Sequence, residues 1–130
     1  MERVTAVIGN ELYKTVVKTT IHSIIADEPE HLGGKDSGFS PSELLAASLA
    51  SCTSITLRMY ANRKKWNVEE IEVTVTFERD AQANTAILDR KIQIKGSLEE
   101  TERLRLLAIA NACPMHKTLN GTINIKTEII

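Results

Sequence analysis

Two cysteines are the residues of this chain whose types could support redox chemistry. Cys52 lies inside the apolar stretch 42–53, and Cys113 opens the tetrad Cys113-Pro114-Met115-His116. If the fold brings the two sulfurs together, they form a redox pair. If it does not, Cys52 is a small buried residue, because free cysteine often behaves as a hydrophobic side chain.

Cys113 is the better placed of the two for thiolate chemistry. It precedes Pro114, which favours a helix start, so its sulfur should lie near free backbone N–H groups that favour the thiolate. His116 and Lys117 could assist. The alternative is a helix N-cap or a buried loop residue. Cys52 is expected in mid-helix, where activation would need a cation or donor from elsewhere in the fold.

Metal binding is the rival interpretation of the cysteines. Cys113 and His116, with Cys52 and either His22 or His31, could supply ligands. A structural zinc site normally uses two closely spaced ligand pairs, and this sequence has one. We therefore predict no metal and no cofactor.

A long helix should position Cys52. Ser40 fits its N-cap, Pro41 its first turn and Glu43 a capping box, and the helix should run to about Lys65. Its first half is apolar or small nearly all round, which predicts burial. Its second half is basic, which is typical of a solvated helix end.

The other elements predict an α+β fold. Two or three strands are expected in the first 25 residues, and a loop follows over 27–40. Alternating residues predict strands over 68–78, 86–95 and 122–129. A capping pattern at Ser97 predicts a helix to about Asn111, and a short helix should cover 114–119.

Composition restricts the class of protein. With 130 residues, 42% hydrophobic and 25% charged, the chain is expected to be one domain over 1–130. A net charge of −1 and 4% aromatic content disfavour a nucleic-acid partner. We expect no membrane span and no signal peptide, and hence a cytoplasmic protein in which a disulfide would be transient and catalytic.

The long helix also predicts the oligomeric state. One small curved sheet can cover only one side of such a helix. Packing two of these helices together between sheets would bury the rest. Burial therefore favours an obligate homodimer.

Two segments resemble one known family. Residues 33–53 (GGKDSGFSPSELLAASLASCT) resemble the central segment of the OsmC/Ohr family, and residues 113–117 (CPMHK) resemble its second-cysteine segment. The resemblance implies an intertwined homodimer with central helices packed against curved antiparallel sheets. It also implies an antioxidant thiol peroxidase of the oxidative stress response that reduces organic hydroperoxides.

In the family pattern, the first cysteine, here Cys52, attacks the peroxide and becomes a sulfenic acid. The second, here Cys113, resolves it as a disulfide. A dithiol, in several members a lipoyl group on a partner protein, then reduces the disulfide. The alternatives are an OsmC-like non-catalytic binder of small apolar ligands and a redox-sensing module.

The sequence departs from the peroxidase pattern at two points. The family acid follows the helix-start proline directly, whereas here Ser42 holds that position and Glu43 comes next. Glu43 is a candidate catalytic residue, although it would face away from Cys52 on an ideal helix and capping suffices to explain it. The family arginine of the N-terminal strands is absent, and Lys14 is the nearest cation to its expected place.

Overall fold

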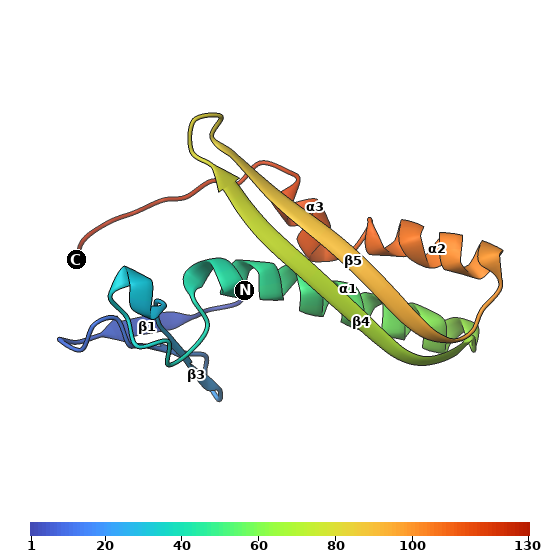
Figure 1. Cartoon of the computed structure of the whole chain (residues 1–130), viewed down its shortest axis with the longest axis horizontal. Coiled ribbons are helices and arrows are strands. Elements are labelled where there is room, and N and C mark those ends of the chain that lie inside the picture. Colours follow the sequence, from blue (N-terminus) through green and yellow to red (C-terminus); the bar gives the residue numbers. More distant parts are fainter. The chain divides into compact units, whose positions relative to one another are not determined.

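The computed structural model describes residues 1–130, arranged as two units, Met1–Ala46 and Ala47–Ile130 (Figure 1). The first unit begins with a three-stranded antiparallel sheet in the order β1-β2-β3. Its strands are β1 (Thr5–Ile8), β2 (Thr15–Lys18) and β3 (Ser23–Ala26). The alternation of small and β-branched residues predicted this meander, and the structure confirms it.

Asp27 organises the loop that follows β3. Its side chain is buried, and its two carboxylate oxygens accept five hydrogen bonds. The donors are the backbone N–H groups of Tyr13, Glu28, Lys35 and Ser37, and the Ser37 hydroxyl at 2.6 Å. One carboxylate therefore satisfies the backbone of a loop that has little regular structure beyond the 3₁₀ helix η1 (Glu30–Leu32).

The long helix α1 (Pro41–Lys64) has the predicted start and nearly the predicted end. At its start, the Ser40 N–H donates to Glu43 Oε1 at 2.9 Å, and the Glu43 N–H donates to Ser40 Oγ at 3.2 Å. This reciprocal pair is a capping box. At its end, Lys65 takes a left-handed conformation, with φ of 59°, which terminates the helix.

Helix α1 is buried along one stripe only. Its buried residues, spaced three, four or one apart, are Leu49, Thr53, Leu57, Tyr60 and Ala61. Leu45, in the first half, is 38% exposed, and Ile55 and Met59, in the second half, are 55% and 68% exposed. The expectation that the first half of this helix is buried all round is therefore wrong within this single chain, because the described elements cover only one side of it.

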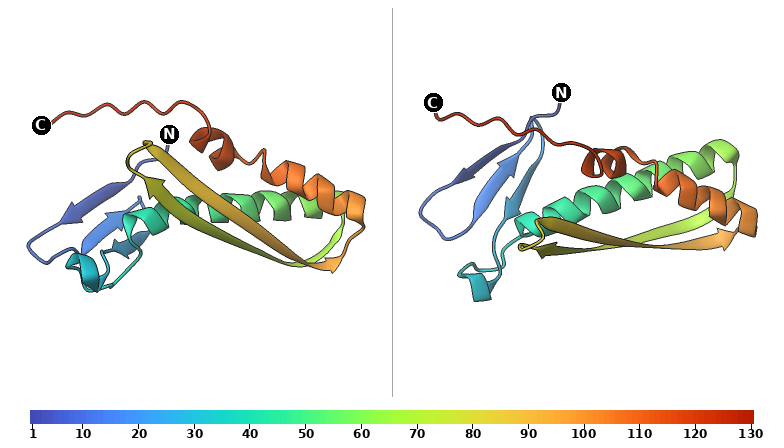
Figure 2. Two further views of the ribbon diagram at one scale, coloured as in Figure 1. Left: turned by 45° about the horizontal axis from the view of Figure 1, so that its top comes forward. Right: turned by 90° about the horizontal axis from the view of Figure 1, so that it is seen from above.

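A long antiparallel hairpin lies against this stripe. It consists of β4 (Asn67–Asp80) and β5 (Thr85–Ser97). Figure 2 shows helices α1 and α2 (Glu100–Ala110) on the same face of the hairpin. Ile71, Ile92 and Ile94 point to that face and pack against the core formed by four buried residues, Leu57, Tyr60, Leu106 and Ala110.

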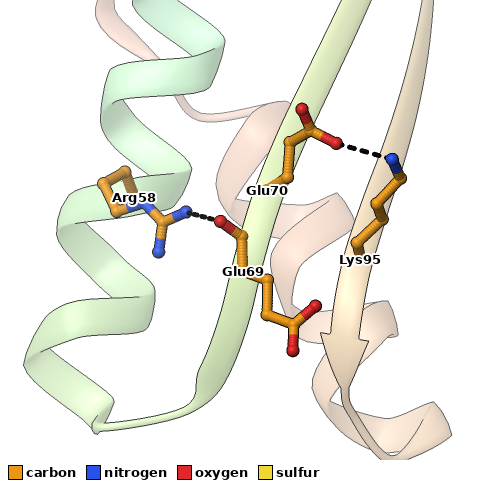
Figure 3. A network of polar contacts seen from close by, with 4 residues as sticks. All are labelled: Arg58, Glu69, Glu70 and Lys95. Carbon is orange, nitrogen blue, oxygen red and sulfur yellow. Dashed lines mark hydrogen bonds and ion pairs between the residues drawn. The ribbon is translucent and has the colours of Figure 1, made fainter.

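Arg58 fastens α1 to an irregularity in β4. The pairing register shifts between Val68 and Glu70, so Glu69 is an extra residue in the ladder. Arg58 donates to the Val68 carbonyl at 2.7 Å. It also donates to the Glu69 carbonyl at 3.3 Å (Figure 3). The reading of Arg58 as part of a solvated basic helix end is therefore wrong, since its guanidinium satisfies two strand carbonyls.

The helices after β5 differ from expectation in one detail. Helix α2 starts after Glu99, whose N–H donates to Glu102 Oε1 at 2.9 Å. The predicted capping box at Ser97 is wrong because Ser97 still pairs with Asn67 in the hairpin. Helix α3 (Pro114–Leu119) follows the prediction.

The predicted last strand is also not formed. Residues 122–130 pair with no strand. Ile125 and Ile129 are 84% and 99% exposed. Alternation alone does not make a strand, because the segment also needs a partner for its backbone N–H and C=O groups.

By length and composition alone, α1 is apolar enough to cross a membrane, contrary to the expectation that no stretch is. This criterion is weak here, because the core helices of soluble proteins also meet it, and α1 contributes Leu57 and Tyr60 to the core.

Candidate redox site

Cys113 lies at the start of α3 and is fully buried, with 0% exposure. Its sulfur accepts a hydrogen bond from the His116 N–H at 3.4 Å, so the side chain caps the helix. Pro114 fixes the first turn, as its ring is preorganised for that position. The N-cap interpretation of Cys113 does not exclude thiolate chemistry. The same sulfur that caps α3 also lies beside a cation.

The cation is Arg90, which comes from β5. It pairs with Val75 in the ladder and shares its face of the hairpin with Ile92 and Ile94. Strand alternation therefore directs this guanidinium toward the helices rather than into solvent. Arg90 Nη1 lies 3.0 Å from Thr53 Oγ1 and 3.9 Å from Cys113 Sγ.

The second nitrogen of Arg90 fixes the orientation of the guanidinium. Nη2 donates to Asn111 Oδ1 at 2.9 Å and lies 3.0 Å from His116 Nδ1. A guanidinium can only donate, so His116 Nδ1 must accept, and the ring proton is on Nε2. The Arg90 fork is thus bound at both ends, which is a geometry that lysine cannot reproduce.

These neighbours determine the ionisation of Cys113. Burial acts to raise the pKa of the thiol, but the opposing interactions are stronger. Hydrogen bonds from the His116 N–H, Thr53 and Cys52, and the positive charge of Arg90, together hold the pKa of Cys113 below its ordinary value. The site therefore favours a thiolate at a fully buried sulfur.

Cys52 is the more accessible partner. It lies in the middle of α1, one residue before Thr53, and is half-buried. Its thiol lies 4.0 Å from Thr56 Oγ1, and its interaction with Cys113 is one of the causes that lower the pKa of the Cys113 thiol. Both cysteines are free thiols. The redox pair that these two cysteines would form stays a prediction.

Glu43, the third candidate, is engaged in the capping box with Ser40. Hydrogen bonds from the Ser40 backbone and side chain hold its pKa below the ordinary value. Capping accounts for this carboxylate, and a catalytic role stays a prediction. No group of three or more His, Cys, Asp or Glu side chains is arranged to hold a metal ion.

Sequence reasoning missed Arg90, Thr53 and Asn111. The family pattern places the activating cation in the N-terminal strands, whereas the cation beside Cys113 in this chain comes from β5. One signal was present: at the inward positions of β5, Leu88, Arg90, Ile92 and Ile94, a single charged residue interrupts an apolar series. A charge on the buried face of a strand needs a partner, and is therefore a marker of a site.

This arrangement can carry out thiol–disulfide chemistry. Two adjacent thiols can form a disulfide, and the favoured thiolate at Cys113 can both attack sulfur and depart from it. The site also has a direction, since only the Cys52 sulfur is partly accessible to a molecule from outside.

Comparison with known proteins places these features in a wider context. The sequence model of the OsmC-like protein family matches residues 34–128, which include both cysteines. A curated protein of Mycoplasma pneumoniae named hydroperoxide reductase is 24% identical over 132 residues, covering 97% of this chain and 92% of that protein.

Solved structures agree in fold. An OsmC-like protein from Mycoplasma pneumoniae superposes with a TM-score of 0.80 at 23% identity, covering 93% of this chain and 88% of that one. The organic hydroperoxide resistance protein OhrB of Bacillus subtilis superposes with a TM-score of 0.64 at 21% identity, covering 97% and 95%. The α+β architecture, with one long helix against antiparallel strands, is therefore shared.

Proposed function

Since this chain belongs to the OsmC-like protein family, we propose that it is a thiol-dependent peroxidase that reduces organic hydroperoxides through Cys52 and Cys113. The observation that carries the proposal is the contact between these two free thiols beside the Arg90 guanidinium. A relative named hydroperoxide reductase supports a peroxidase-type role. Residues 1–130 act as one OsmC-like domain in this proposal.

The oxidative half of the cycle starts at the accessible sulfur. The Cys52 thiolate attacks the terminal oxygen of the hydroperoxide, the O–O bond breaks, and an alcohol leaves after taking up a proton. Cys52 is now a sulfenic acid. The Cys113 thiolate attacks this sulfur, the S–O bond breaks, and the hydroxide leaves as water after taking up a proton. A Cys52–Cys113 disulfide remains. An external dithiol, such as the lipoyl group of a partner protein, reduces it.

Apolar residues beside Cys52 support an organic substrate. Ile55 and Met59 follow Cys52 at helical spacings of three and seven, so they continue the same face of α1. Both are exposed, and with Ser54, Arg58 and Ile71 they line an open groove of about 400 Å³. Such a surface suits the hydrocarbon part of a hydroperoxide and gives no advantage to hydrogen peroxide.

The same groove motivates the alternative function, which is binding of small apolar ligands without turnover. This reading predicts an apolar molecule that co-purifies with the chain and slow reaction with peroxide. A ligand-free protein with rapid turnover would exclude it.

The proposal includes a homodimer in the cytoplasm. The unpaired residues 122–130 expose apolar side chains that a second copy would cover. A reducing compartment also suits two cysteines that must return to free thiols after each cycle.

The direct test is oxidation of the purified, reduced protein with one equivalent of cumene hydroperoxide. We expect intact mass to fall by two hydrogens, and peptide mapping to place the disulfide between Cys52 and Cys113. Hydrogen peroxide at the same concentration should react more slowly. Free thiols that persist after the organic peroxide would contradict the proposal.

Two variants assign the roles of the sulfurs. In Cys113→Ser, a sulfenic acid should be trapped at Cys52 by dimedone. In Cys52→Ser, the buried Cys113 should form a sulfenic acid much more slowly than Cys52 does in Cys113→Ser. Trapping at Cys113 rather than at Cys52 would reverse the assignment.

A further inference from the structure

We propose that Arg90 is a positioning residue for the reductive half of the cycle: it receives the departing Cys113 sulfur, so that the external thiol attacks Cys52 and not Cys113. This inference rests on the proposed Cys52–Cys113 disulfide and deepens that function. It assigns a direction to disulfide reduction and a role to an arginine of β5.

Access favours attack at Cys52. Cys113 is fully buried beneath β5 and α3, whereas Cys52 is half-buried on α1. An attacking thiolate must approach along the S–S axis, on the far side of the sulfur that it attacks. Cys52 is therefore the residue of the pair that a reductant can reach from solvent.

Stabilisation of the leaving group favours the same direction. In thiol–disulfide exchange, the sulfur whose thiolate is the more stable leaves the faster. Cys113 Sγ has two N–H donors beside it, the His116 N–H at 3.4 Å and Arg90 Nη1 at 3.9 Å. Negative charge that develops on this sulfur therefore meets donors that are already in place.

The placement of Arg90 depends on its other contacts. Asn111 and His116 bind Nη2, and Thr53 binds Nη1, so the fork faces Cys113 in a single orientation. The guanidinium is half-buried, and the helices shield the charge pair from solvent screening. Asn111 and His116 flank Cys113 in sequence. One short segment therefore supplies both the sulfur and two of the groups that orient the Arg90 guanidinium.

The balanced step is as follows. The thiolate of an external dithiol forms a bond to Cys52 Sγ, the Cys52–Cys113 bond breaks, and its electron pair leaves with Cys113 Sγ as the thiolate. The second thiol of the reductant, after losing its proton, attacks the mixed disulfide. It releases Cys52 as a thiolate, and the reductant departs as its own disulfide. The dithiol is oxidised by two electrons and the protein disulfide is reduced.

The first test maps the site of attack on the unmodified protein. The disulfide is formed with diamide, so that the test does not depend on any reaction with peroxide. Excess glutathione, a monothiol, is then added, and samples are quenched with acid after seconds. Trypsin separates the sulfurs into peptides 36–58 and 106–117. We expect the glutathione adduct on peptide 36–58; an adduct on peptide 106–117 would overturn the inference.

The second test measures the role of Arg90. Diamide-oxidised Arg90→Met should be reduced by dithiothreitol about tenfold more slowly than the unmodified protein, because Cys113 becomes a poorer leaving group. Arg90→Lys should recover part of the rate. Arg79→Met is the matched control, since Arg79 is an exposed arginine of the same hairpin, and its reduction rate should not change.

A third readout separates positioning from folding. In a Cys52→Ser background, thiolate absorbance at 240 nm reports the titration of Cys113, and Arg90→Met should shift that titration to higher pH. A folded Arg90→Met protein with unchanged titration and unchanged reduction rate would refute the inference. Failure of the proposed function would look different: the diamide disulfide would still be reduced through Cys52, while organic peroxide would leave the thiols unoxidised.

Discussion

At the scale of single residues, the two cysteines have divided properties. Cys52 is within reach of molecules from outside, and Cys113 has the contacts that stabilise a thiolate. Attack on a peroxide requires an accessible sulfur, and resolution of the sulfenic acid requires a stabilised thiolate. The proposed cycle therefore needs both residues, because neither alone combines access with charge stabilisation.

Glu43 provides a test of capping against catalysis. Glu43→Gln keeps an oxygen that can accept from the Ser40 N–H but removes the charge, whereas Ser40→Ala removes the reciprocal bond and keeps the charge. If capping is the whole role of Glu43, Ser40→Ala should lower the free energy of unfolding by about 1 kcal/mol. Neither variant should then slow peroxide reduction. Calorimetry and stopped-flow oxidation measure the two effects. A large rate loss in Glu43→Gln alone would make Glu43 catalytic.

The residues of the site were only partly predictable from sequence. The cysteines could be found by type, and the N-cap position of Cys113 followed from Pro114. Arg90 could not be found by spacing, because its contacts with Thr53, Asn111 and His116 come from segments far apart in the chain. The inward charge on β5 indicated an interaction but did not identify its partner.

At the scale of elements, the loop after β3 depends on one carboxylate. The hydrogen bond from the Ser37 side chain, together with backbone N–H groups, holds the pKa of Asp27 far below its usual range, although burial acts to raise it. Glycines allow the loop to close: a Cβ at Gly34 would lie 2.0 Å from the Glu28 carbonyl oxygen. Loop order should therefore respond to pH through this carboxylate.

The sign of this dependence follows from linkage. Because the pKa of Asp27 is lower in the folded state, its contribution to stability is complete well above the unfolded pKa of about 3.9 and is lost as pH falls below it. Asp27→Asn, which places an amide N–H₂ against N–H donors, should lower the melting temperature by several degrees at pH 7. This difference should shrink at pH 3. Asp89→Asn, at an exposed position of β5, is the control. An equal deficit at both pH values would contradict the assignment.

Local signals predicted most elements well. Ser40, Pro41 and Glu43 determine the start of α1 through contacts within four residues, so the sequence contains the whole cause. Ser97 has the same local signal, but its pairing with Asn67 keeps it in the hairpin. Arg58 likewise resembled a solvated residue, because its carbonyl partners belong to the irregular start of β4.

At the scale of the whole molecule, a second copy would complete the unpaired apolar surfaces. Residues 122–130 alternate as a strand does, and Ile123, Ile125 and Ile129 are exposed. A partner strand from another chain would satisfy both the backbone groups and the isoleucines. Such a partner would account for alternation in a segment that pairs with no strand of its own chain.

Removal of residues 121–130 should therefore weaken the homodimer. We expect sedimentation velocity to show a dimer for the complete sequence and a lower apparent mass, at the same micromolar concentration, for the shortened chain. Ile123→Thr with Ile125→Thr is the matched variant, because threonine keeps the preference for extended backbone and removes apolar area. A monomer at all concentrations for the complete sequence would contradict the dimer proposal.

The double role of Cys113 in α3 has a mechanical consequence. The sulfur that accepts the His116 N–H at the start of this six-residue helix is the one whose charge disappears on oxidation. A disulfide sulfur is a weak acceptor, so the first turn of α3 loses its anchor when the bond forms. The helix should then fray, so oxidation of the Cys113 sulfur should lower the order of the whole segment 114–119.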